Sequence, residues 1–283
     1  MTMWELFLIF VDMFVDTHTH FYDEWLLPDA EAAIQRALDA GVGKMIQADV
    51  DSLERSRMWE TGLRHPGVLF QMLGLYPGSV TADNWKEELD AVYRIAAGDS
   101  LASLGMTGTT PGMTGIVAIG EIGLDYHEGK EFAREQKEVL RLQFELAAKL
   151  NLPVNIHLRD AWEDFFSVLE DCRHLHLRGN LHCFSGSYEV YERANRSGDF
   201  AVGIGGVLTF KNASLPAVVA RIPAEHLLLE TDAPYLAPVP YRGKRNESAY
   251  LPLIAARLAE VKGLSLNEIE TITTDNAIRL FNL

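Results

Sequence analysis

The sequence predicts an α/β protein that folds as a TIM (β/α)8 barrel in a single domain. Short apolar runs alternate with longer helical patterns eight times along the chain. Several of these runs are continuous, as in 116–119, which is typical of parallel strands that helices cover on both faces. A length of 283 residues suits one barrel of roughly 250 residues, although it also allows two smaller domains. A doubly wound open sheet explains the same alternation and stays the alternative.

The apolar runs define the expected strands, because short runs bounded by polar residues are typical of buried strands. They lie at residues 13–18, 44–48, 68–75, 116–121, 154–157, 180–183, 200–204 and 227–231. Helical stretches lie between them, and the clearest is 131–150. There Leu140, Phe144 and Ala147 recur at the spacing of one helix face, and Asn151 marks the expected end.

Two further helical patterns, 249–261 and 266–281, lie at the C-terminal end and are expected to close the barrel. Ser265 fits the N-cap of the second helix, and Glu268 completes a capping box. One segment interrupts the alternation. Residues 98–115 are rich in Gly, Thr and Ser and are expected to form a surface insertion.

Residues 13–283 are the expected barrel domain, and residues 1–12 are expected to be an N-terminal extension. The apolar run in the extension lacks the positive region and the small-residue cleavage site of a signal peptide. It is also too short to span a bilayer. We therefore expect a cytoplasmic protein without membrane contact, and the sequence gives no sign of an obligate protein partner.

The composition excludes several classes of protein. Hydrophobic residues make up 48% of the chain, which is too many for a disordered protein. Two cysteines are too few for a disulfide-rich secreted scaffold. A net charge of −15 argues against broad, non-specific coating of nucleic acid. It leaves room for a small basic site on an acidic body.

The strongest local signal is the run Asp16-Thr17-His18-Thr19-His20. In an extended strand, residues i and i+2 point to the same face, so His18 and His20 direct two imidazoles toward one point. Imidazole is the commonest metal ligand in proteins, although two surface histidines are an equally acceptable explanation of the pair alone. Its place at the end of the first strand favours a site, because barrel active sites lie at the C-terminal ends of the strands.

Four other polar residues end apolar runs in the same way: Glu121, His157, His182 and Asp232. Each alone could cap a helix or be a hydrogen-bonded core residue. Together with the histidine pair they would bring six potential ligands to one rim. Six ligands exceed the three or four that bind one zinc ion, and they suit two metal ions that share a bridging carboxylate.

The sequence resembles the TatD-like metal-dependent hydrolases of the amidohydrolase superfamily. The resemblance covers about residues 13–283 and rests on blocks in the family's order: DTHTHFYD (16–23), AIGEIGLDY (118–126), PVNIHLRDA (153–161), HCFSGS (182–187), LLETDAPYLAP (228–238) and RGKRNE (242–247). It implies a TIM barrel with a binuclear metal centre at the C-terminal rim. It also implies phosphodiester hydrolysis, usually described as DNase activity, and the deacylation of mischarged D-aminoacyl-tRNA is a further activity of the family.

Carried over to this sequence, the resemblance implies that His18, His20 and Asp232 hold the first metal and that Glu121 bridges to a second. His157 and His182 would complete the second site. Asp232 and Glu121 are then the expected catalytic residues. A bridging carboxylate at Glu121 fixes the spacing of the two metals, and Asp232 can also accept the proton of the attacking water. Zinc is the expected metal for histidine-rich ligation, and manganese, nickel or magnesium remain alternatives. Asp16 would either orient an imidazole or support the barrel.

The substrate contacts depart in part from the family pattern. The family commonly has Gly-x-His-Pro after the third strand, whereas here Tyr76 replaces that histidine. We expect Tyr76 to face the substrate, together with Arg159. Arg242, Lys244 and Arg245 form a basic loop after the eighth strand, where this fold often binds phosphate. A solvated basic loop is the simpler alternative.

The leading hypothesis is a metal-dependent hydrolase that cleaves phosphodiester bonds with a metal-activated water, with a nucleic-acid end or another phosphate-containing molecule as substrate. An ester or amide hydrolase, such as a D-aminoacyl-tRNA deacylase, is the alternative within the enzymes. A binding protein with an inactive, metal-stabilised barrel is the alternative of another class.

Overall fold

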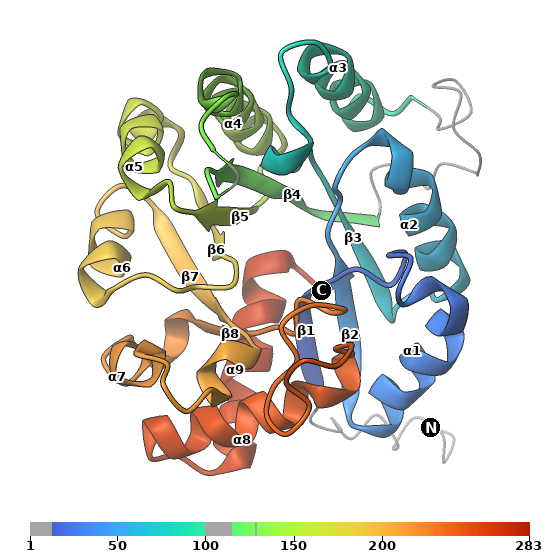
Figure 1. Cartoon of the computed structure of the whole chain (residues 1–283), viewed down its shortest axis with the longest axis vertical. Helices are drawn as coiled ribbons and strands as arrows, with labels where there is room; N and C mark the ends of the chain where they lie inside the picture. Colours follow the sequence, from blue (N-terminus) through green and yellow to red (C-terminus); the bar gives the residue numbers. More distant parts are fainter. Residues whose placement is uncertain (1–12, 100–114, 128) are drawn as a thin grey trace, which may run out of the picture.

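The computed structural model describes residues 13–99, 115–127 and 129–283. The expected extension, residues 1–12, and positions 100–114 of the expected insertion lie outside the described residues. Figure 1 shows a ring of strands surrounded by helices, as the sequence predicts. In the described ranges, no helix is long and apolar enough to cross a membrane.

Eight parallel strands form one sheet in the order β1 to β8. Their bounds are β1 Phe14–Thr19, β2 Val42–Gln47, β3 Leu69–Leu73, β4 Ile116–Asp125, β5 Val154–Arg159, β6 Arg178–Leu181, β7 Asp199–Ile204 and β8 Leu227–Leu229. The segment after β8 returns to β1, because Asp232 N donates to His18 O (2.9 Å) and His20 N donates to Ala233 O (2.8 Å). These bonds join the two edges of the sheet, so the predicted barrel is confirmed and an open sheet is excluded.

The helices cover the outside of the barrel (Figure 1). They are α1 Ala30–Asp39, α2 Ser52–Arg64, α3 Trp85–Ala96, α4 Ala133–Leu150, α5 Trp162–Asp171, α6 Tyr188–Ala194, α7 Leu215–Val219 and α8 Leu251–Lys262. Helix α9, Leu266–Phe281, lies at one end of the barrel instead. The expected capping box of Ser265 and Glu268 is present at the start of α9. Asn151 ends α4 in the left-handed conformation, as its position after the last apolar residue predicts.

Helix α9 closes the N-terminal end of the barrel. Thr274 Oγ1 donates to Met13 O just before β1, and Asn276 Nδ2 donates to Leu227 O at the start of β8. Phe281 is buried against side chains of the barrel interior, including Val15. With that end covered, the C-terminal ends of the strands are left for the site.

The strands differ from the sequence expectation mainly at their ends. Strand β4 continues past Glu121 to Asp125, because residues 122–125 pair with β5. Strand β8 ends at Leu229, two residues before the expected end, because the chain there turns to bond with β1. Glu121 therefore lies within a strand, whereas Asp232 follows one.

Candidate metal centre

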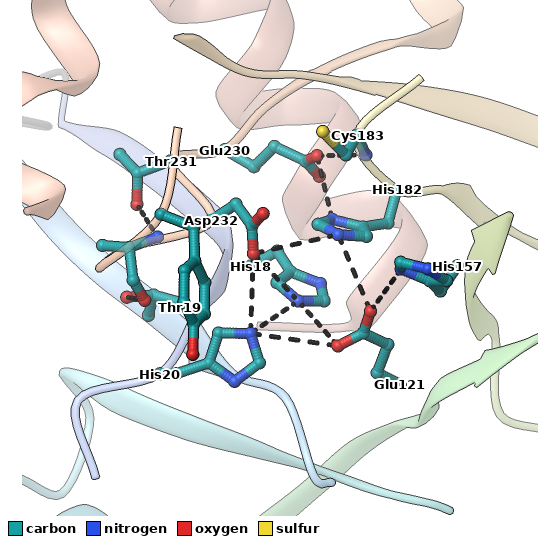
Figure 2. A network of polar contacts seen from close by, with 12 residues as sticks. His18, Thr19, His20, Glu121, His157, His182, Cys183, Glu230, Thr231 and Asp232 are labelled. Atoms are coloured by element: carbon teal, nitrogen blue, oxygen red, sulfur yellow. Dashed lines mark hydrogen bonds and ion pairs between the residues drawn. The ribbon is translucent and has the colours of Figure 1, made fainter. Parts of the chain in front are cut away.

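The six predicted ligands come together at the C-terminal ends of the strands. Figure 2 shows their side chains pointing toward one another from β1, β4, β5 and the segments after β1, β6 and β8. Within the described residues, two groups have ligand atoms that all lie within 4.8 Å of one another. One group is His18, Glu121 and His182, and the other is His18, His20 and Asp232.

Glu121 lies at the centre and divides the histidines between its two oxygens. Oε2 lies 3.3 Å from His18 Nε2 and 3.8 Å from His20 Nε2. Oε1 lies 2.8 Å from His157 Nδ1 and 3.8 Å from His182 Nε2. A carboxylate in this position can contribute one oxygen to each of two neighbouring cations.

Asp232 faces Glu121 across the histidines. Its Oδ1 lies 3.5 Å from His20 Nε2, 3.8 Å from His18 Nε2 and 3.9 Å from His182 Nε2. Its backbone has a φ of 57°, in the left-handed region that only a few non-glycine residues adopt. This conformation lets its N–H bond to His18 O while its carboxylate turns toward the imidazoles.

Acceptors outside the centre fix the orientation of His18 and His20. His18 Nδ1 lies 2.9 Å from Asn155 Oδ1. His20 Nδ1 lies 2.8 Å from the hydroxyl of Tyr22, which donates its own proton to Ala48 O. Both Nδ1 atoms must therefore carry the proton, and in the neutral ring both Nε2 atoms keep a lone pair that faces the centre.

Carboxylates fix the other two histidines. His157 Nε2 lies 3.0 Å from Asp125 Oδ2, so its Nδ1 faces Glu121. His182 Nδ1 lies 3.0 Å from Glu230 Oε1, so its Nε2 faces the centre. Glu230 is itself held by the N–H of Cys183 and by Asn180 Nδ2. Gly203 leaves room for it, because a Cβ there would lie 1.9 Å from Glu230 Oε2.

This donor set fits a metal ion. The two Nε2 atoms of His18 and His20 lie only 3.1 Å apart. Two unprotonated nitrogens cannot hydrogen-bond to each other, whereas a cation can bind both lone pairs. Histidine nitrogens held by outer acceptors, beside carboxylates, are the arrangement that proteins use for zinc and similar ions.

The charges of the centre are strongly coupled. Burial opposes ionisation of Glu121, but His18 and His157 hold its pKa well below the usual range. Burial likewise opposes ionisation of Asp232, whose pKa is lowered by His182, His20 and His18. Both carboxylates are therefore ionised at neutral pH. Burial disfavours the charged form of His182, yet Glu230 and Asp232 raise its pKa to about 10. A metal ion at such a nitrogen would have to displace a proton.

The comparisons with known proteins agree with this geometry. The sequence profile of the family described as TatD related DNase matches residues 15–282. The chain belongs to the TatD family. It is 38% identical to the uncharacterized metal-dependent hydrolase YabD of Bacillus subtilis over 96% of this chain and 100% of that protein. The crystal structure of YJJV, a TatD homolog from Escherichia coli K12, superposes with a TM-score of 0.81 at 29% identity, covering 95% of this chain and 98% of that one. The resemblance stated from the motifs is confirmed, and this TatD-family chain is a metal-dependent hydrolase.

Sequence reasoning did not identify the acceptors that orient the four imidazoles in this TatD-family centre. They are Tyr22, Asp125, Asn155 and Glu230. Among the described residues, Asp16 forms no hydrogen bond or ion pair with an imidazole ring. Its carboxylate accepts from the N–H (2.9 Å) and the hydroxyl (2.6 Å) of Thr231, so it supports the junction of β1 with the segment after β8. Of the two roles considered for Asp16, support of the barrel is the one that its contacts match.

Tyr76 lies beside the centre, where the TatD family commonly has histidine. Its ring is 5.1 Å from that of His157, and its hydroxyl donates to Asp125 Oδ2 at 3.2 Å. Burial raises the pKa of Tyr76, so the hydroxyl stays a neutral donor. Arg159 ends β5 with an exposed side chain that forms no ion pair with the described residues.

The three cations of the basic loop differ in their surroundings. Arg242 and Lys244 are exposed, and they lie over the rings of Phe210 (4.4 Å) and Tyr241 (5.9 Å). Arg245 instead binds the carboxylate of Asp29 through both terminal nitrogens. A guanidinium engaged in this way has less freedom to bind phosphate, so Arg242 and Lys244 are the better placed of the three for a substrate contact.

We expect Glu230→Gln to weaken metal binding by about 10- to 100-fold, the usual effect of losing an outer partner of a ligand histidine. Glutamine has a single acceptor oxygen, whereas His182, Cys183 and Asn180 all direct donors at Glu230. Competition with a chelating dye measures the affinity. Glu88→Gln is the matched control, because Glu88 also accepts from a backbone N–H and a side chain, both of Ser52. Equal affinities in the two variants would contradict a role for Glu230.

Proposed function

We propose that this protein is a nuclease that hydrolyses phosphodiester bonds at an end of a nucleic-acid chain. The observation that carries the proposal is the division of the four imidazoles between the two oxygens of Glu121, because this arrangement suits two adjacent cations. A relative supports the substrate class. The chain is 34% identical to the 3'-5' ssDNA/RNA exonuclease TatD of Erwinia tasmaniensis, over 90% of this chain and 94% of that protein.

In this proposal two divalent ions bind per chain. His18, His20 and Asp232 would hold the first ion, and His157 and His182 would hold the second. Glu121 would contribute one oxygen to each ion. Zinc is the expected metal because four of the six ligands are imidazoles, with manganese, nickel or magnesium as alternatives. When bound, a pair of such ions lowers the pKa of a water and neutralises charge on a phosphoryl group.

The residues of the chain supply the proton transfer. Asp232 is ionised because His182 and His20 overcome the effect of burial and lower its pKa, so its carboxylate can accept the proton of the attacking water. Its side chain is 14% exposed, compared with 0% for His18, so it lies on the accessible side of the centre. Tyr76 lies beside His157, and Arg159 lies on the same strand as His157. Both would contact the substrate from that side.

The charge of the protein favours binding at an end over binding along a duplex. A body with a net charge of −15 repels long stretches of phosphate. Arg242 and Lys244 provide local positive charge in the loop after β8, which suffices for one or two phosphate contacts.

A panel of substrates tests the proposal. The metal-loaded protein is incubated with single-stranded, nicked and blunt duplex DNA, single-stranded RNA and D-aminoacyl-tRNA, and the products are separated by size. We expect nucleotides to be released stepwise from chain ends. Release of the amino acid alone would instead support a deacylase. No product from any substrate, with two metals verified per chain, would support an inactive binding protein.

Replacement of the exposed cations should affect substrate binding more than chemistry. We expect Arg242→Ala and Lys244→Ala each to raise KM for an oligonucleotide, since the loss of one charge-assisted hydrogen bond costs roughly 1.5–3 kcal/mol. Metal content should not change, because neither side chain contacts a proposed ligand in the described structure. Steady-state kinetics and elemental analysis check both points. Unaltered KM values would mean that the loop is only solvated.

A further inference from the structure

Two aromatic side chains are exposed beside the metal centre. In the described part of the chain, two aromatic side chains of phenylalanine, tyrosine or tryptophan are exposed: Trp25 at 57% and Tyr235 at 44%. They lie together, with ring centroids 6.0 Å apart. The ring of Tyr235 is 6.1 Å from that of His20. The most exposed aromatic surface of the barrel is thus next to a proposed metal ligand.

Polar contacts hold these two residues in place. Asp23 accepts from the Trp25 N–H through Oδ1 (2.8 Å) and from the Tyr235 hydroxyl through Oδ2 (2.7 Å). Arg245 Nη1 donates to Trp25 O at 2.9 Å, and Asp29 binds the same guanidinium. One carboxylate therefore fixes both aromatic residues, and Arg245 anchors the backbone of one. We call Trp25 and Tyr235 the aromatic platform.

We propose that the aromatic platform stacks the base of an unpaired nucleotide whose phosphate lies at the metal centre. This inference rests on the proposed nuclease function and adds to it a site for the base. Every base has a flat aromatic face, so stacking binds single strands with little dependence on sequence. The planes of the two rings are tilted by 51° to each other, so a flat base stacks on one ring and meets the other at an angle. A base within a duplex is already stacked and paired, and it would have to leave its partner to bind in this way. The platform therefore selects single strands and frayed ends.

The surroundings of the platform favour a nucleobase over an apolar partner surface. Asp23 accepts from the backbone of one of these residues and from the hydroxyl of the other, so their rings offer a small surface. That surface adjoins the centre that would bind the neighbouring phosphate. Stacking also adds affinity that does not depend on charge. A protein with a net charge of −15 gains little from general attraction to phosphate and needs such a contact.

A fluorescent base tests the inference. A single strand with 2-aminopurine at its 3' end and phosphorothioate linkages is titrated with the metal-loaded protein, and the quenching caused by stacking is recorded. We expect Trp25→Leu to abolish the quenching and to weaken binding by about 5- to 150-fold, which corresponds to roughly 1–3 kcal/mol for one stacked base. Trp25→Phe, which retains an aromatic ring, should keep most of the quenching and most of the binding affinity. Val239→Ala shortens an exposed apolar side chain that has no aromatic ring, so it should change neither the quenching nor the binding affinity.

An abasic end separates stacking from general apolar contact. In the wild type, removal of the terminal base should weaken binding as much as Trp25→Leu does, and in Trp25→Leu it should have no further effect. Equal binding of the normal and abasic strands by the wild type would overturn the inference, as would an effect of Val239→Ala equal to that of Trp25→Leu. If the wild type cleaved the normal and abasic strands equally when both were made with ordinary phosphodiester linkages, the nuclease function would be supported and only the aromatic platform would be rejected. If the wild type neither bound nor cleaved any oligonucleotide, both the nuclease function and the aromatic platform would be rejected.

Discussion

Asp232→Asn is expected to lower kcat by about 10²–10⁴-fold with both metal sites saturated, the usual contribution of a general base. The amide oxygen of asparagine can still bind a cation, but the amide cannot accept a proton at neutral pH. The carboxylate that is lost is ionised in the structure, because His182 and His20 overcome the effect of burial on its pKa.

The measurement must separate loss of metal from loss of proton transfer. Single-turnover rates are recorded at rising metal concentration, and elemental analysis verifies two metals per chain. If Asp232 only binds metal, excess metal restores the wild-type rate. If Asp232 also accepts the proton, the rate stays low at full occupancy. A near-normal kcat in the saturated variant would leave Asp232 as a ligand alone.

The barrel and the meeting point of the six proposed ligands could be predicted from the sequence for one reason. Parallel strands in a barrel all end on the same side, so polar residues that end apolar runs must meet there. This held even where the strand limits were wrong. Glu121 lies within β4 and Asp232 follows β8, yet both face the same centre.

The outer acceptors could not be assigned in the same way, although a signal was present. Tyr22, Asn155 and Glu230 each lie two residues from a proposed ligand, which is the spacing of one strand face. Of these three residues, only Tyr22 accepts a hydrogen bond from the ligand nearest to it in sequence, His20. Asn155 binds His18 on another strand, and Glu230 contacts His182. These pairings depend on how the barrel closes, which strand periodicity does not encode.

The basic loop shows a second limit of sequence reasoning. Arg242, Lys244 and Arg245 carry the same charge within four positions, so nothing in the sequence separates them. In the structure, Arg245 binds Asp29, which lies more than 200 positions away in the chain, and it also donates to Trp25 O. Long-range ion pairs of this kind decide which cations stay available to a substrate.

Glu121→Gln is expected to reduce the metal content from two ions to one per chain and to lower kcat by about 10²–10⁴-fold, because the loss of one ion removes several kcal/mol of charge stabilisation. Glutamine has nearly the same shape as glutamate, so the buried position should be filled without a cavity. Its amide nitrogen, however, cannot bind a cation. Since Oε2 faces His18 and His20 and Oε1 faces His157 and His182, one histidine pair would meet an N–H group instead of a carboxylate oxygen.

The two carboxylate variants should fail in different ways, and the difference tests the assignment of a bridge. Asp232→Asn should keep two ions per chain and lose rate, whereas Glu121→Gln should lose an ion first. Glu121→Asp provides the control, because its shorter carboxylate still has two oxygens and should retain more of the second ion than the amide does. Elemental analysis across a range of metal concentrations measures this order directly. Two ions per chain in Glu121→Gln, bound as tightly as in the wild type, would show that the two histidine pairs hold their ions without a shared carboxylate.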